Sequence, residues 1–171
     1  MCIRDSYYSE GYAYILAFKN ETSIGEDIVI TQKDIREVQK AKAAIQTAYK
    51  ILSSKLGVSR KNIDEIYVAG SFGFYMNPEN AITIGLLPEV NANKVRIVGN
   101  TAGSGARVLL KNIKWRTKAE KIAKNINYVE LAAEPEFSKI FVNTTYFPSG
   151  YIEDYPRTIR KLGLKYIKRD N

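Results

Sequence analysis

The sequence predicts an α/β domain built in layers, and three observations lead to this prediction. Segments with strand-like and helix-like patterns alternate along the 171 residues, and this order favours at least some parallel strand pairs. The strongest segment, 31–56, carries apolar residues at helical spacing. Two apolar strands, 66–69 and 94–98, each run into a glycine-rich turn. Ligands of open α/β sheets bind at the carboxyl ends of strands, so these turns are the first candidates for a site.

The first part of the chain is predicted to form strands followed by one long helix. Residues 7–18 are rich in tyrosine, alanine and β-branched side chains, and 28–30 are apolar, so both segments are predicted strands. Thr31 and Asp34 resemble a capping box with Asp in the place of Glu or Gln. The helix that begins there stops at Gly57. Its apolar side chains form one stripe: Ile35, Val38, Ala41, Ile45, Ala48, Leu52 and Leu56.

The middle of the chain is predicted to continue the alternation. Asn77 and Pro78 indicate the start of a helix, with Asn as N-cap and Pro at the first position, and Gly85 ends it. A loop of small residues, 99–106, follows the strand 94–98 and leads into a helix that reaches Leu110.

Beyond that loop we expect three more elements and then an extension. Helices are predicted at 116–126 and 135–147, and the alternation of residues 128–131 is typical of a strand. Residues from Pro148 onward show no clear periodicity until Ile159.

Composition excludes several kinds of site. The chain has no histidine, so it cannot build a Ser-His-Asp or Cys-His catalytic group or a histidine-ligated metal site. Its only cysteine, Cys2, can form neither an internal disulfide nor a zinc or iron–sulfur site by itself. No apolar run approaches the ~20 residues that span a bilayer, so we expect no membrane segment. We take a cytoplasmic location as the default.

The two ends of the chain call for separate interpretation. Met1-Cys2-Ile3-Arg4-Asp5 followed by Ser is what a common sequencing-library transposase adapter encodes in frame, so we expect residues 1–6 to be an adapter scar. Residues 7–147 would then form the domain, and 148–171 a basic carboxyl-terminal extension. From Arg157 onward the chain has six basic side chains and one acid. We interpret this tail as a solvated, partly disordered end rather than a nucleic-acid site.

Two glycine-rich turns hold the candidate binding residues. The first candidates are Gly70, Ser71, Phe72 and Gly73, and the second are Gly99, Asn100, Gly103, Ser104 and Gly105. Glycine lets backbone N–H groups approach a phosphate or nucleoside, and the helix that opens near Thr101 or Ala102 adds a positive dipole end. Each turn alone is equally explained as a tight turn after a buried strand. Neither is a Walker loop, because no Gly-Lys-Ser/Thr occurs.

Three strings, in this order, carry a resemblance to a known family: TQKDIREVQKAKAAI, IYVAGSFGFYMNPENAITIGLLP and VRIVGNTAGSGA. Together they resemble the C-terminal domain of the reductive activators of corrinoid proteins, from about Asp27 to Phe147. The resemblance implies a ribonuclease H-like, actin-like ATPase subdomain of the ASKHA superfamily, with a mixed sheet flanked by helices. It further implies that the first turn is the adenosine motif and the second a wall of the nucleotide cleft.

The function that this resemblance implies is ATP-dependent reductive activation. Such activators return an inactivated Co(II) corrinoid protein to Co(I) with an electron from an iron–sulfur domain. The cofactors implied are ATP and Mg²⁺, and a [2Fe–2S] cluster in an N-terminal region that this chain lacks. The partners implied are a corrinoid iron–sulfur protein or a corrinoid methyltransferase protein, with no membrane or nucleic acid. A homodimer is left open, and we expect this part alone not to turn over ATP.

The residues themselves leave two further hypotheses open. One is a non-enzymatic α/β module that docks a corrinoid protein or another subunit, with the glycines serving only as turns. The other is a dinucleotide or S-adenosylmethionine enzyme, for which Glu130 is the candidate ribose-binding acid. Asp34, Gln39 and Lys42 near the start of the long helix could face a cleft, but we interpret them as surface residues.

Overall fold

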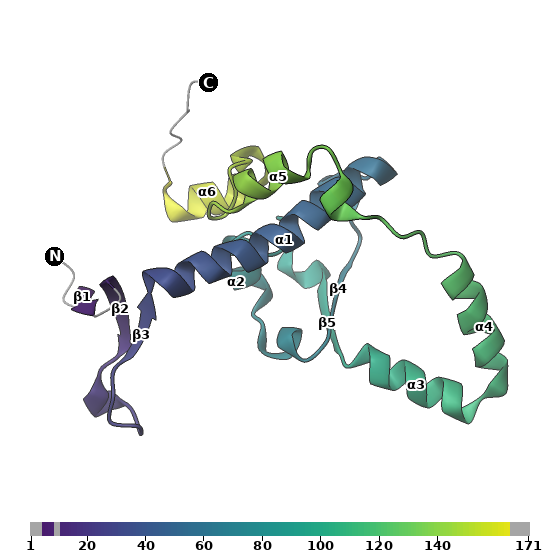
Figure 1. Ribbon diagram of the computed structural model, residues 1–171, viewed down its shortest axis with the longest axis horizontal. Helices are drawn as coiled ribbons and strands as arrows, with labels where there is room; N and C mark the ends of the chain where they lie inside the picture. The colour runs from purple at the N-terminus through teal and green to yellow at the C-terminus, as the bar shows by residue number, and fades with distance from the viewer. Residues whose placement is uncertain (1–4, 9–10, 165–171) are drawn as a thin grey trace.

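The computed structural model describes residues 5–8 and 11–164, which form five strands and six α-helices besides short 3₁₀ turns. Figure 1 shows a long central helix with a small sheet at its amino-terminal end and a helical projection near the other end. The elements are β1 (Asp5–Tyr8), β2 (Gly11–Ala17), β3 (Ile28–Thr31), α1 (Gln32–Leu56), β4 (Ile66–Ala69), α2 (Pro78–Thr83), β5 (Val95–Gly99), α3 (Thr101–Lys111), α4 (Ile113–Lys124), α5 (Phe137–Thr144) and α6 (Pro156–Leu162).

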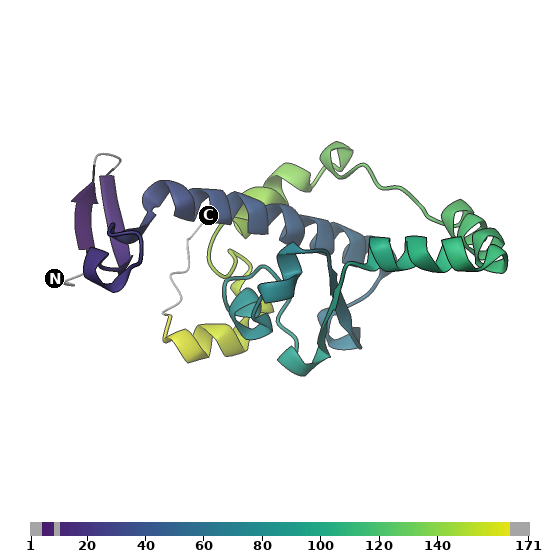
Figure 2. The same cartoon turned by 90° about the horizontal axis from the view of Figure 1, so that it is seen from below.

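The α/β class is confirmed, and the described strands lie in two small sheets. One is antiparallel with the order β1-β2-β3, so the predicted strand 7–18 is two strands of a hairpin rather than one. The other is the parallel pair β4-β5, in which Tyr67 lies opposite Arg96. Figure 2 shows the three-stranded sheet standing apart from the parallel pair. Residues 1–4 of the expected adapter segment, Cys2 among them, lie outside the described residues, and Asp5 and Ser6 belong to β1.

Local signals in the sequence explain where the helices begin and end. The Thr31 hydroxyl accepts a hydrogen bond from the Asp34 N–H at 3.2 Å, and the Asp34 carboxylate accepts one from the Thr31 N–H at 2.8 Å. The predicted capping box of α1 is therefore confirmed. Gly57 ends this helix with a φ of 63°. The Asn77 N-cap and Pro78 at the first position of α2 are confirmed as well.

A compact apolar cluster anchors the parallel pair to α2. Its buried members come from α2, from the loop that follows it and from the first residue of β5: Ala81, Ile82, Leu87, Val90 and Val95. Side chains of β4 pack on this cluster, among them Ile66 and Val68. Burying one side chain of the size of valine, leucine or isoleucine stabilises the folded state by about 1.5–3 kcal/mol. The cluster therefore fixes β4 and β5, and with them the turns at their carboxyl ends.

Helix α1 buries a polar face, which the apolar stripe did not predict. Its buried side chains are Lys42, Ala43, Gln46, Thr47 and Ile51, and they face α5 and the segment that follows it. The predicted stripe stays exposed, with 48% of Ile45 and 75% of Leu56 accessible. The interpretation of Lys42 as a surface residue is wrong, because its side chain is fully buried and its ammonium group bonds to the Pro148 carbonyl.

Hydrogen bonds satisfy most of this polar core. The Lys42 ammonium donates to the Pro148 carbonyl at 2.7 Å and lies 5.4 Å from the Phe147 ring centre. The Gln46 amide nitrogen donates to the Gly85 carbonyl at 3.0 Å and to the Tyr155 hydroxyl at 2.6 Å. Such groups are expensive to bury unless they are paired, so these bonds hold the end of the chain in one position on α1.

Burial of Lys42 gives the stability of the protein a specific pH dependence. Desolvation lowers the pKa of Lys42 from 10.5 to about 8. The unfolded chain therefore holds this proton more tightly, and stability is expected to rise as the pH increases from about 8 toward 10.5, by up to ~1.4 kcal/mol per pH unit. Urea unfolding below and above pH 8 measures this rise. In Lys42→Met the rise should disappear, and an unchanged slope in that variant would contradict the assignment.

The first part of the basic tail is ordered as α6, while its described basic side chains Arg157, Arg160 and Lys161 are exposed, as expected of solvated charges. The carboxylate of Glu89, 2% exposed, accepts hydrogen bonds from the N–H groups of Arg157 and Thr158 at 3.1 and 2.7 Å. Burial by itself would raise the pKa of Glu89, but the two N–H donors outweigh burial and lower it. Glu89 thus caps the first turn of α6 from outside the helix. Lys165, Lys168 and Arg169 lie outside the described residues.

Three other predictions about the second half need correction. Most of the small-residue segment 99–106 is helical rather than a loop, because α3 begins at Thr101, where a helix was expected to open. Residues 128–131 form no strand, and a 3₁₀ turn begins at Leu131. The predicted helix 135–147 is the shorter α5. Among the described residues, no helix is long and apolar enough to cross a membrane.

Candidate nucleotide site

The two candidate turns meet at the carboxyl ends of β4 and β5. The strands run in parallel with Ala69 opposite Gly99, and a register shift separates this pair from Val68. The Gly70 N–H then donates to the Gly99 carbonyl at 2.9 Å, which joins the two turns directly. The sequence placed them in separate motifs, and the structure brings them together at one edge of the sheet.

Positive backbone angles shape both turns. Gly70 has a φ of 94° and Gly99 a φ of 64°, in the region that side-chain-bearing residues rarely adopt. A Cβ built on either glycine meets no atom within 4 Å. The same holds for Gly105 on α3, whose φ is not positive. These three glycines therefore offer bare backbone to the surroundings, as a close approach of a ligand requires.

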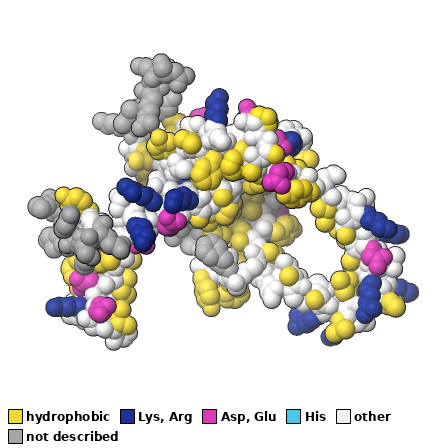
Figure 3. Space-filling model, in the orientation of Figure 1, with side chains coloured by type: hydrophobic (Ala, Val, Ile, Leu, Met, Phe, Trp, Pro, Cys, Tyr) yellow, Lys and Arg dark blue, Asp and Glu magenta, His cyan; other side chains and the backbone are white. Residues whose placement is uncertain are grey.

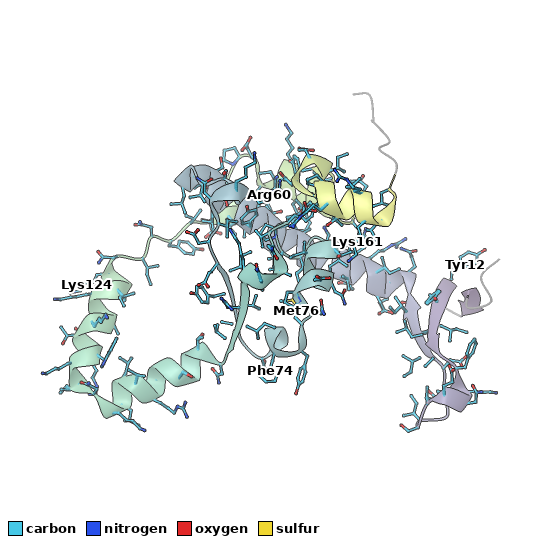
Figure 4. All side chains as sticks on the ribbon, turned by 180° about the vertical axis from the view of Figure 1, so that it is seen from behind. Tyr12, Arg60, Phe74, Met76, Lys124 and Lys161 are labelled. Carbon is cyan, nitrogen blue, oxygen red and sulfur yellow. The ribbon has the colours of Figure 1, made fainter. Side chains whose placement is uncertain are left out.

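The other candidate glycines pack against their own chain. Gly73 is buried, and a Cβ there would overlap the Val68 side chain, so this glycine is needed for the turn to lie on β4. A Cβ on Gly103 would lie 2.9 Å from the Asn100 amide nitrogen. Ser71 is exposed and begins the 3₁₀ turn Phe72–Tyr75, in which Phe72 contributes backbone. Figure 4 places Phe74 at the end of this turn, where its side chain points away from the core.

Asn100 organises the start of α3. Its side-chain oxygen accepts a hydrogen bond from the Gly103 N–H at 2.8 Å, which makes it the N-cap. The N–H groups of Thr101 and Ala102 stay at the open end of the helix, where the helix dipole is positive. Ser104, one turn further along, is exposed. This arrangement favours an anionic group, such as a phosphate, next to Gly99.

A polar cluster marks the opposite end of the same strands. Tyr67 donates a hydrogen bond to Glu65, and the Arg96 guanidinium donates to the same carboxylate at 3.2 Å. The Tyr67 hydroxyl and Arg96 lower the pKa of Glu65, and Glu65 in turn raises the pKa of Tyr67. This cluster borders an open cavity of about 540 Å³. It lies by the amino ends of β4 and β5, away from the glycine turns.

The described residues give no complete metal site. Among them, no three Asp, Glu, Cys or His side chains gather closely enough to hold an ion. The carboxylate of Glu130, the acid considered for a ribose, accepts a hydrogen bond from Tyr128 at 2.6 Å. What the site offers is therefore backbone donors and bare glycines.

Comparisons with known proteins point to one family. A family model described as the C-terminal domain of RACo, the ASKHA domain, matches residues 3–158. A corrinoid activation enzyme, RamQ of Eubacterium limosum, is 41% identical over 127 residues, which are 74% of this chain and 21% of RamQ. A "[Co(II) methylated amine-specific corrinoid protein] reductase" of Methanosarcina barkeri is 29% identical over 145 residues, 82% of this chain and 27% of the reductase.

A solved structure shows the same fold. The reductive activator for a corrinoid, iron–sulfur protein superposes with a TM-score of 0.82 and 35% identity, over 90% of this chain and 24% of the activator. The chain thus spans between about a fifth and a quarter of the length of these relatives. The family model covers far more than half of the chain. This chain therefore belongs to the family of C-terminal ASKHA domains of RACo.

Proposed function

We propose that this chain is the nucleotide-binding part of an ATP-dependent reductive activator, which returns a Co(II) corrinoid protein to Co(I). The observation that carries the proposal is the joining of the two glycine turns at the carboxyl ends of β4 and β5, in a chain that belongs to this family. The relatives are named for corrinoid activation and for reduction of a Co(II) corrinoid protein, which supports the same substrate class here.

The chain's own residues would bind and orient the nucleotide. Gly70 and Gly99 would leave room for the adenosine and ribose next to the backbone, because no atom of the described residues lies within 4 Å of a Cβ built on either glycine. The open first turn of α3, held by Asn100, would receive a phosphate through its backbone N–H groups. Phe72 and Gly73 shape the 3₁₀ turn that borders this space, and Gly105 extends the bare surface along α3.

The rest of the site would come from the longer protein. Neither β4 nor β5 pairs with a further strand among the described residues. Parallel sheets are normally covered on both faces, so we expect the longer protein to cover this pair. The exposed apolar stripe of α1, which includes Ile45 and Leu56, is a second surface that we expect the longer protein to bury. We assign the Mg²⁺ ligands, the group that activates water and a [2Fe–2S] domain to that remaining part. Its cluster would supply the electron for cobalt.

The decisive experiment uses the full-length activator with its corrinoid protein and a low-potential electron donor. Formation of Co(I), followed by its absorbance under anaerobic conditions, should require hydrolysable ATP. Equal Co(I) formation with and without ATP would overturn the proposal. Binding of the corrinoid protein that proceeds identically with and without nucleotide, in a protein that binds no ATP, would support the docking-module alternative instead.

A further inference from the structure

Besides the tail, a second concentration of positive charge lies in the helical projection formed by α3 and α4. Residues 101–126 contain seven of the 26 basic side chains and only one of the 18 acidic ones, Glu120. The basic residues are Arg107, Lys111, Lys114, Arg116, Lys118, Lys121 and Lys124. All seven are exposed. Figure 3 shows basic side chains spread over this projection, and Figure 4 shows Lys124 pointing outward from the end of α4.

These charges are not neutralised within the described part of the chain. In the part of the chain that the structure describes, ion pairs join basic residues of other segments to carboxylates, but none of the seven takes part in one. Arg116 donates to the Leu109 carbonyl at 3.1 Å, and the Lys118 ammonium lies 4.4 Å from the Trp115 ring centre. Like charges at this density repel one another, so their concentration here favours a function outside the fold.

Three of the four lysines of α4 form one line. Lys114, Lys118 and Lys121 are spaced by four and three residues and share a helical face. They span about 10 Å along the axis. Trp115 and Ile122 have the spacing of a separate, apolar face. The two faces can therefore serve different surfaces, with the apolar one left for the protein's own body and the lysine face for a partner.

We propose that the lysine face of α4, defined as Lys114, Lys118 and Lys121, docks a carboxylate-rich surface of the corrinoid protein. This inference rests on the proposed function, because an electron-transfer partner must be bound briefly and released. Small interfaces steered by complementary charge suit such encounters, since they accelerate association without strong affinity. Nucleic acid fits less well. The one aromatic ring that the structure shows beside the face, Trp115, already lies under the Lys118 ammonium, and the three lysines offer point charges rather than an arginine fork for phosphate.

The test compares two charge reversals in the full-length activator. Lys114→Glu/Lys118→Glu/Lys121→Glu should slow association with the corrinoid protein at least tenfold at low salt and flatten its dependence on ionic strength. The matched control is Lys33→Glu/Arg36→Glu/Lys40→Glu, which changes the same charge on an exposed face of α1. The control should leave association within about twofold. A triple Lys→Gln variant of α4 should show an intermediate loss and guards against misfolding by the reversal.

Several results would overturn the docking surface. If the α1 and α4 reversals slowed association equally, the net charge of the protein, and not the lysine face, would set the association rate. A normal association rate in the α4 variant, combined with lost binding to anionic vesicles, to duplex DNA or to a second activator copy, would assign the face to that other occupant. Failure of the proposed function is separable from these outcomes. An activator that needs no ATP for Co(I) formation, yet loses association only through the α4 reversal, disproves the function and keeps the docking surface.

Discussion

Replacing Gly85 with alanine is expected to destabilise the protein by about 3–5 kcal/mol, at the upper end for a single substitution. Gly85 has a φ of 77°, and a Cβ there would overlap the Pro148 carbonyl oxygen and lie 2.7 Å from its carbonyl carbon. Backbone cannot move aside as a flexible side chain can. The segment around Pro148 would have to shift, and its hydrogen bond from Lys42 would be lost with it.

A control separates this overlap from the cost of the backbone angle. Gly25 has a φ of 70°, and a Cβ there meets no atom within 4 Å. Gly25→Ala should therefore cost only about 1–2 kcal/mol, the strain of a left-handed residue. Urea unfolding of both variants in the same protein background measures the difference. If Gly85→Ala were no worse than Gly25→Ala, the close packing of Pro148 on Gly85 would be wrong.

The sequence predicted those elements whose signals are local. The capping box of α1, the Asn77-Pro78 start of α2 and the strand 66–69 were all predicted and are present. Each depends on residues a few positions apart, such as Thr31 and Asp34. Nearby residues fix these features whatever the rest of the chain does.

Contacts between distant residues account for what the sequence missed. Helix α6 has no N-cap hydrogen bond of its own, and its first turn is satisfied by Glu89, which lies 69 positions before Thr158. No local pattern reveals such a cap. Lys42 was also misinterpreted, because polar residues on a helix are usually exposed and only its distant partner Pro148 explains its burial.

The site was predictable in its parts and not in its assembly. The glycines after both strands were visible in the sequence, since glycine after an apolar strand marks a turn. The hydrogen bond between Gly70 and Gly99 depends on the parallel register of β4 and β5, which no string of residues gives. Which glycines are bare and which are packed was equally hidden. Gly70 and Gly105 face open space, whereas Gly73 is pressed against Val68.

Replacing Gly70 with valine is expected to lower the nucleotide affinity of the full-length activator at least tenfold. Gly70 has a φ of 94°, and a β-branched side chain would fill the space that the proposed adenosine and ribose occupy. Titration with a fluorescent ATP analogue measures the loss. Gly57→Val is the matched control, because Gly57 also has a positive φ of 63° with open space beside it, but it ends α1 away from β4 and β5. The control should bind the analogue normally.

Gly105 tests the same surface without backbone strain. Its φ is not positive and a Cβ meets no atom within 4 Å, so Gly105→Ala should stabilise α3 by up to about 1 kcal/mol through helix propensity alone. Gly105→Val keeps the helix but adds bulk beside the proposed nucleotide, and it should weaken the analogue's binding while thermal stability stays close to that of the wild type. Normal affinity in both Gly70→Val and Gly105→Val would show that the glycines serve only as turns. The nucleotide would then have to bind elsewhere, and the assignment of this edge of the sheet would fail.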